Sequence, residues 1–267
     1  MTAKSVTKKE QTAMTVADDL YADENYITQD ELSADSYAVP RLALLEKMSP
    51  QVDESEAEFI EGAKPGMIFN SVTNEIYDVT DEALKIIPCL RKHVFVEWVI
   101  REDGGGFVAV YDYATGRDMM KQTTRDEKNR DILSNGHELQ ETMEFYVLYL
   151  DPNNNELTPA VISMARTRMK EAKRWNFRID NRVVNGRKLK DIAQVYDMKS
   201  AQRKGDQGTS YVWKAGDSLT VDQVFDDYRA AMQHAIEFRT AVASGERGVD
   251  YNDTTAQQHE DIPEEQF

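Results

Sequence analysis

The chain has 267 residues, of which 40% are hydrophobic and 30% charged, a balance typical of a folded core with polar extensions. It contains 32 Lys+Arg and 48 Asp+Glu, so its formal net charge is −16. No apolar run is long enough for a membrane span, and we expect no secretory signal. The single cysteine, Cys89, excludes an internal disulfide and a multi-thiolate metal site.

The negative charge is concentrated toward both ends of the chain. Residues 1–62 hold 5 basic and 14 acidic side chains, and residues 216–267 hold 3 and 12, a balance of −9 in each segment. Residues 164–204 hold 13 Lys/Arg and 4 Asp/Glu, a balance of +9. A basic centre between acidic flanks predicts a site for a polyanion, with anionic arms that compete for it.

The first part of the chain predicts an arm followed by a β-rich domain. Residues 1–37 lack apolar periodicity, which predicts a flexible N-terminal arm. The first apolar cluster, VPRLALL (39–45), is where we expect the chain to dock onto a domain spanning residues 38–244. From Gly66 onward, β-type runs between turn residues predict strands at 67–72, 84–90, 94–100, 107–113, 144–150 and 209–215.

Connections and helices complete the predicted domain. The glycine-rich run REDGGG (101–106) predicts a hairpin, and the polar residues 114–140 predict a long exposed loop. A helix over 163–176 places Ala165, Met169 and Ala172 on one stripe, with basic residues beside it. A second helix over 220–244 starts with a capping box and ends before Gly245. Residues 245–267 offer nothing for a core, so we expect a disordered acidic tail.

These elements predict an α+β, β-rich fold: an OB-like barrel with helical additions between disordered acidic termini. The chain contains no GxGxxG, GxxxxGK[ST], GxSxG or HExxH motif. Its four histidines are scattered, without a second His or Cys at metal-ligand spacing. We therefore expect no enzymatic activity, no cofactor and no metal.

The strongest chemical feature is the basic segment that follows residue 165. Cations attract backbone phosphates, and aromatic side chains between them stack on unpaired bases. The alternative is a solvated helix face whose cations cover the sheet with their stems, the aromatic residues being buried. Under the first interpretation, the nucleic-acid-binding residues are Arg166, Arg168, Lys170, Lys173, Arg174, Trp175, Phe177, Arg178, Tyr211, Trp213 and Lys214.

The sequence ends in HEDIPEEQF (259–267). An acidic tail that stops at an aromatic residue resembles the tails of bacterial and phage single-stranded DNA-binding proteins, which dock into basic, apolar pockets of replication partners. The bacterial ending Asp-Ile-Pro-Phe is interrupted here by Glu264-Glu265-Gln266. The resemblance implies partner binding through Asp261, Ile262, Pro263, Glu264, Glu265 and Phe267.

A broader resemblance covers residues 26–214. The segments YITQDEL, VPRLALLEKMSPQVDE, GAKPGMIFN, VEWVIREDGGGFVAVYD, EFYVLYLD and PAVISMARTRMKEAKRWN are similar to a family of tailed-phage proteins. Some members of that family are described as single-stranded DNA-binding. The resemblance implies a phage origin and a class of function, but it transfers no contact residue.

The expected function is therefore sequence-independent binding of single-stranded DNA in phage replication, recombination or repair, in the cytoplasm of the infected host. The expected partners are this DNA and, through the tail, phage or host replication and transcription proteins. The alternative is a phage interaction or regulatory protein that contacts host polymerase or virion components without binding DNA.

Overall fold

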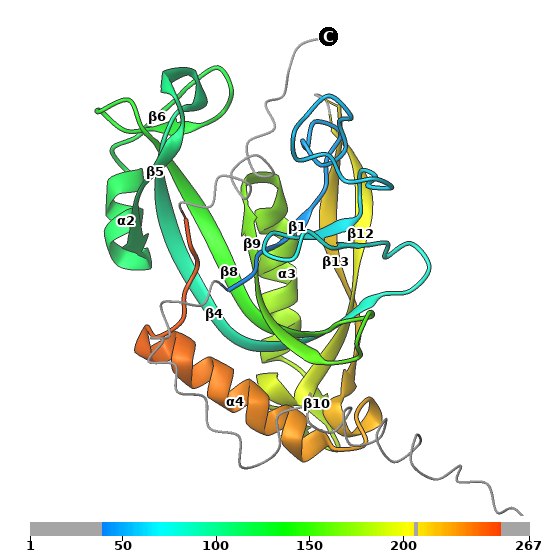
Figure 1. Ribbon diagram of the computed structural model, residues 1–267. Helices are drawn as coiled ribbons and strands as arrows, with labels where there is room; N and C mark the ends of the chain where they lie inside the picture. Colours follow the sequence, from blue (N-terminus) through cyan, green and yellow to red (C-terminus); the bar gives the residue numbers. More distant parts are fainter. Residues whose placement is uncertain (1–38, 206–207, 252–267) are drawn as a thin grey trace, which may run out of the picture. The chain divides into compact units, whose positions relative to one another are not determined.

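The computed structural model describes residues 39–205 and 208–251 (Figure 1). The expected arm over residues 1–37 lies outside them. The main sheet is antiparallel, with strand order β13-β12-β4-β8-β7-β6, and β5 and β9 pair additionally with β4 and β8. Its strands are β4 (Leu84–Val99), β5 (Gly106–Asp112), β6 (Thr124–Arg125), β7 (Asp131–Ile132), β8 (Glu138–Leu150), β9 (Leu157–Ala165), β12 (Gln194–Gly205) and β13 (Gly208–Thr220).

The long strand β4 joins the two arms of this sheet. Its residues 84–86 pair with β12, whereas its residues 94–99 pair with β5. Register shifts between Pro88 and Leu90 and between Glu97 and Trp98 mark bulges, which increase local bend and twist. The sheet curls into a half-barrel (Figure 1). This confirms the α+β, β-rich class, while the assignment to the OB fold stays a prediction.

Two small sheets complete the β structure. β1 (Leu42–Leu44), β2 (Ile68–Asn70) and β3 (Ile76–Tyr77) form a three-stranded sheet, and β10 (Val183–Val184) pairs with β11 (Arg187–Lys188) in a hairpin. All three residues of β1 are buried. The apolar cluster over residues 39–45 therefore docks into the domain as predicted.

The helices differ in extent from the predicted ones. They are α2 (Tyr113–Met120), α3 (Met169–Asp180) and α4 (Tyr228–Ser244), with 3-10 turns η2 (Arg101–Asp103), η3 (Arg166–Arg168), η4 (Asp191–Ala193) and η5 (Val221–Gln223). The helix predicted from residue 163 begins at Met169, because the residues through Ala165 belong to β9. The predicted capping box, Thr220 with Gln223, is present on η5 instead of α4. The predicted loop over 114–140 holds α2, β6, β7 and the start of β8.

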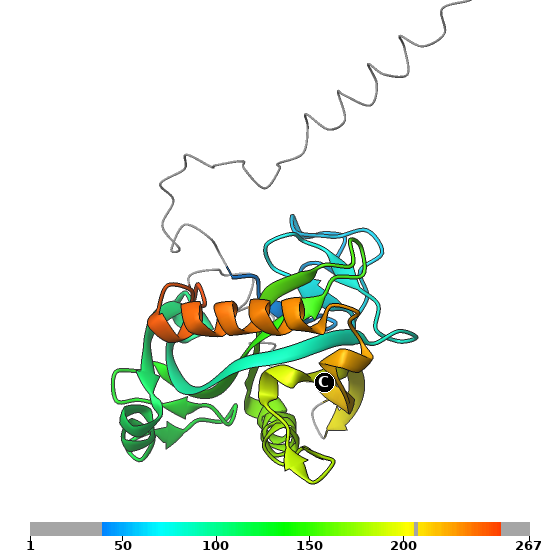
Figure 2. The same cartoon turned by 90° about the horizontal axis from the view of Figure 1, so that it is seen from below.

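The two faces of the sheet bury two separate groups of side chains. On β8, Phe145, Val147 and Tyr149 point into a core shared with α3. The alternating residues Tyr146 and Leu148 point to the opposite face, into a core shared with α4. Figure 2 shows α3 and α4 on opposite sides of the sheet. This period-two alternation is the reason one strand supports a helix on each face.

Residues 245–251 lie against the sheet, in contrast to the predicted tail. Gly245 ends α4 at a φ of 83°, and Val249 packs against the core beneath that helix. The ring of Tyr251 stacks on Phe107 with centroids 4.9 Å apart, and its hydroxyl donates to Glu144. The prediction that residue 245 begins a tail without core contacts is wrong for residues 245–251. The rest of the predicted tail lies outside the described residues.

Candidate nucleic-acid interface

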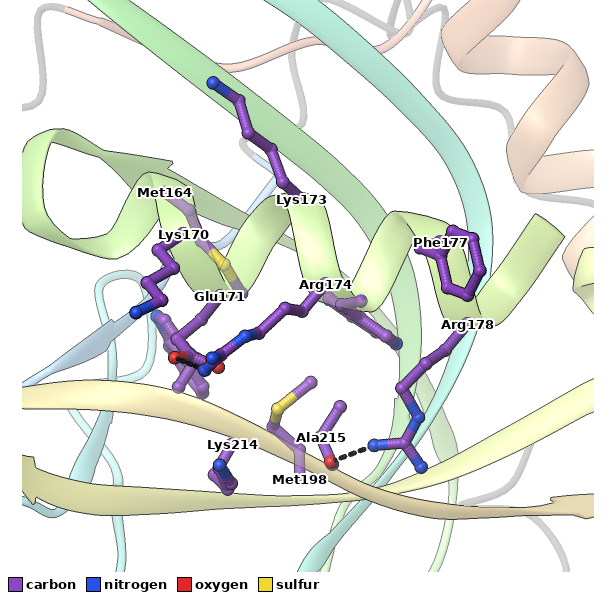
Figure 3. A pocket seen from close by; sticks show the side chains of 12 residues that line it. Met164, Lys170, Glu171, Lys173, Arg174, Phe177, Arg178, Met198, Lys214 and Ala215 are labelled. Carbon is purple, nitrogen blue, oxygen red and sulfur yellow. Dashed lines mark hydrogen bonds and ion pairs between the residues drawn. The ribbon is translucent and has the colours of Figure 1, made fainter. Parts of the chain in front are cut away.

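A groove of about 900 Å³ runs between α3 and the β12–β13 hairpin (Figure 3). It forms because α3 buries only one face: Met169, Ala172, Trp175 and Ile179, which recur at helical spacing. The basic face predicted from the sequence therefore turns outward. The groove is lined by Met164, Lys170, Glu171, Lys173, Arg174, Trp175, Phe177, Arg178, Met198, Trp213, Lys214 and Ala215.

Two of the predicted contact arginines hold the outer edge of β13. Arg168 is 8% exposed, and its Nε donates to the carbonyl of Tyr211 at 3.3 Å. Arg178 donates through Nη1 to Ala215 O at 2.6 Å and through Nη2 to Gly216 O. Carbonyl groups on an edge strand otherwise remain open to pairing with another chain. These cations therefore have a structural role in the edge, which the sequence analysis did not anticipate.

Arg168 is further committed to a buried ion pair. Its Nη2 lies 2.9 Å from Glu46 Oε1, and the same carboxylate accepts the backbone N–H of Tyr211 at 3.0 Å. Burial raises the pKa of Glu46, while the charge of Arg168 opposes that shift. Arg168 cannot leave this pair for a phosphate without stranding a buried charge. The prediction that Arg168 contacts DNA is not supported.

Arg166 has a comparable structural task. Its Nη2 lies 2.6 Å from Glu138 Oε2, and the Glu138 side chain is only 7% exposed. Arg166 lies on η3, one turn before α3, and not on the helix where the spacing placed it. It neutralises a buried carboxylate on β8, so it does not join the cations that line the groove.

The two tryptophans do not present the stacking surfaces that we predicted. Trp175 and Trp213 are 2% and 1% exposed, and Trp175 already stacks on Phe145 with centroids 4.3 Å apart. Both rings form the floor of the groove. The ring of Tyr211 packs so close to Gly66 that a Cβ there would lie 2.5 Å from Tyr211 Cε1. The expectation of base stacking on Trp175 and Trp213 is therefore wrong for this structure.

The free binding groups of the groove are fewer than the sequence suggested. Lys170 and Lys214 make no ion pair or side-chain hydrogen bond with another described residue, and they lie on opposite walls. Lys173 lies 3.7 Å from Glu141, and Arg174 lies 2.6 Å from Glu171. In Figure 3, Arg178 points toward the strand, whereas Lys173 points away from it.

One aromatic ring remains available. Phe177 is 69% exposed on the last turn of α3 and lines the groove with these cations. In the floor, the buried Nε1 of Trp175 has no hydrogen-bond partner among the described residues. The groove thus offers cations and one exposed ring, which suits an anion with a planar apolar part.

Four residues that line the groove were not predicted: Met164, Glu171, Met198 and Ala215. Met164 and Met198 lie on β9 and β12, two strands that were not predicted, and both line the groove. Arg182 donates to Ser218 O at 2.9 Å and continues the row of arginines along β13. No sequence signal separates such an edge-binding arginine from a phosphate-binding one.

Three further observations bear on the remaining predictions. The predicted partner-binding residues Asp261, Ile262, Pro263, Glu264, Glu265 and Phe267 lie outside the described residues. Among the described residues, no helix has the length and apolar character needed to cross a membrane. Within the same residues, no group of three or more His, Cys, Asp or Glu side chains could hold a metal ion.

Comparisons with known proteins gave one match. The model of a family described as Pam3 phage gp34-like protein matches residues 8–247. No curated protein matched the chain. No solved structure matched it either.

Proposed function

Because the chain belongs to the Pam3 phage gp34-like protein family, we propose that it serves a phage as a sequence-independent single-stranded DNA-binding protein. The observation that carries this proposal is the exposed Phe177 among the cations of the α3 groove. Single strands are bound by cations that follow the backbone and by aromatic rings on which bases stack. Duplex DNA hides its base faces, so the ring favours an unpaired strand.

Each side chain of the groove can be assigned a role in DNA binding from its contacts. Lys170 and Lys214 would bind phosphates from the two walls, because neither is committed to another described residue. Lys173 and Arg174 would add charge, because their side chains remain 62% and 55% exposed beside their carboxylate partners. Phe177 would stack on a base.

The exposed ring of Phe177 supports binding without sequence preference, because every base offers a face on which it can stack. Among the described residues, the lining also contains no Asn or Gln, the side chains that read adenine edges. Its one carboxylate, Glu171, accepts from Arg174. We propose no catalytic step for this site. Recruitment of replication or transcription proteins by residues 261–267 is proposed from the sequence resemblance alone, and action in the host cytoplasm follows from the proposed role.

The test is an anisotropy titration of labelled oligo-dT and of a duplex, repeated over a range of salt. We expect tighter binding of oligo-dT and a steep loss of affinity with salt. A Lys170→Ala/Lys214→Ala variant should lose two phosphate contacts. The slope of log K against log salt should then become less negative by about 1.4. Lys121→Ala is the matched control, because Lys121, the residue that caps the C-terminus of α2, is exposed but lies outside the groove.

Two results would contradict the proposal. Absence of oligo-dT binding at low salt would favour the interaction or regulatory protein without a direct DNA role. Binding with an unchanged salt slope in the folded double variant would remove the α3 groove from the DNA site.

A further inference from the structure

A separate hairpin follows the groove at the C-terminal end of α3. β10 and β11 pair only with each other, in the register Val183↔Lys188 and Val184↔Arg187. Asn185 and Gly186 form the two-residue turn with φ values of 50° and 74°, the backbone geometry that favours Asn-Gly in tight hairpins. Val183 and Lys188 therefore share one face of the hairpin.

This hairpin exposes an apolar side chain among cations. Val183 is 56% exposed, on a strand that belongs to neither large core. Arg187, Lys188 and Lys190 are all exposed, and neither Arg187 nor Lys190 makes an ion pair with another described residue. A single exposed valine is common on protein surfaces. Here it follows the last turn of α3, which carries the exposed Phe177.

We propose that the β10–β11 hairpin recognises the junction between a paired and an unpaired DNA segment, with Val183 against the terminal base pair. This inference rests on the proposed binding of single-stranded DNA in the α3 groove. An apolar side chain at a base step stacks on or separates base pairs, and adjacent basic residues hold the phosphates. The positive charges of Arg187 and Lys188 on β11 complement the phosphates at the duplex end.

The arrangement of α3 and the hairpin favours, as the ligand, a junction between duplex and single strand over a continuous single strand. The unpaired strand would continue from the hairpin across Phe177 and along α3 to Lys170 and Lys214. The hairpin is too short to add a stacking platform, because its only apolar side chains are Val183 and Val184. Its chemistry suits the flat end of a duplex better than a series of separate bases. The hairpin for the paired end follows α3 directly in the chain, and α3 forms one wall of the groove for the single strand.

The experiment compares four DNA probes: oligo-dT, the same strand joined to a short duplex in each of the two polarities, and the blunt duplex. We expect the tailed duplex of one polarity to bind about tenfold more tightly than oligo-dT, a difference of about 1.4 kcal/mol. Val183→Ser should remove most of this preference and leave oligo-dT binding within about twofold. Val72→Ser is the matched control, since Val72 is 49% exposed on a turn between β2 and β3.

A fluorescent base analogue at the terminal base pair supplies a second readout. Its emission should rise when the wild type binds the tailed duplex and should not rise with Val183→Ser. Equal affinity of the wild type for oligo-dT and both tailed duplexes would overturn the junction proposal while leaving the proposed function intact. A preference that survives in Val183→Ser would overturn the role of the hairpin. Failure to bind any single strand, with binding to anionic vesicles, would overturn both proposals.

Discussion

The contacts of Tyr251 predict that the last described residues stabilise the domain. The ring stacks on Phe107 at 4.9 Å and meets the edge of Trp98 at 6.3 Å. Its hydroxyl donates to Glu144, whose side chain is only 1% exposed and otherwise accepts from Tyr146 at 2.9 Å. Burial raises the pKa of Tyr251, which keeps the phenol protonated and able to donate.

The magnitude follows from these contacts. Aromatic pairs contribute about 0.5–1.5 kcal/mol each, and removing a donor from a buried carboxylate costs about 1–3 kcal/mol. Tyr251→Ala should therefore lower the free energy of unfolding by about 3 kcal/mol, a drop of roughly 6–12 °C in Tm for a domain of this size. Tyr251→Phe should lose only the hydrogen-bond part.

Thermal and urea denaturation measure both variants, with Tyr228→Ala as the control because Tyr228 is an exposed ring on α4. Truncation after Tyr251 should leave Tm unchanged, whereas truncation after Gly245 should match or exceed the loss in Tyr251→Ala. If Tyr251→Ala unfolds at the wild-type temperature and urea concentration, the packing of residues 245–251 contributes nothing and the reasoning fails.

Two further predictions concern surface charge and the β13 edge. Hydrogen bonds from Arg130 and Lys128 lower the pKa of Glu102 to about 2, below the unfolded value of ~4.3. This stabilisation is present above pH ~4.3 and is lost as the pH falls toward 2. Urea denaturation should therefore find Glu102→Gln less stable than the wild type at neutral pH, by less than about 1 kcal/mol because the site is exposed. The difference between the two proteins should disappear near pH 2. Arg178→Met leaves the carbonyls of Ala215 and Gly216 without their donor, so it should cost about 1–2 kcal/mol and speed amide exchange near that edge. Arg187→Met, at an arginine without an ion pair to another described residue, should change neither quantity.

The parts of the fold that could be predicted are those decided by local pattern. The hairpin at REDGGG is present, with Gly104, Gly105 and Gly106 at φ values of 104°, 66° and 132°. The β4 strand was predicted as two because the polar run Arg91-Lys92-His93 interrupts its apolar pattern. In the folded chain, β8 supplies a partner along almost the whole length, so pairing overrides the local composition.

The helix boundary was misplaced for a related reason. In the sequence, residues 163–165 fit the helical spacing of the residues that follow them. In the structure, these three residues pair with residues 142–144 of β8. A short apolar run fits either period, and only the partner strand decides. The site suffered from a different ambiguity. Charge counts identified the basic segment. They could not show that Arg166 and Arg168 form ion pairs with the buried Glu138 and Glu46, or that Arg178 donates to a carbonyl of β13.

The two aromatic residues of α3, Trp175 and Phe177, provide the decisive test of this reassignment. They lie two positions apart, about 200° around the helix, so one faces the core and the other faces solvent. Phe177→Ala should therefore weaken oligo-dT binding by roughly 1–3 kcal/mol while Tm stays near the wild-type value. Trp175→Ala should instead lower the free energy of unfolding by about 3–5 kcal/mol, because it leaves a cavity beside Phe145. Trp175→Phe keeps most of that volume and should bind DNA normally. Titration and denaturation of the three variants separate the two roles, and wild-type affinity in a folded Phe177→Ala protein would show that no base stacks on this ring.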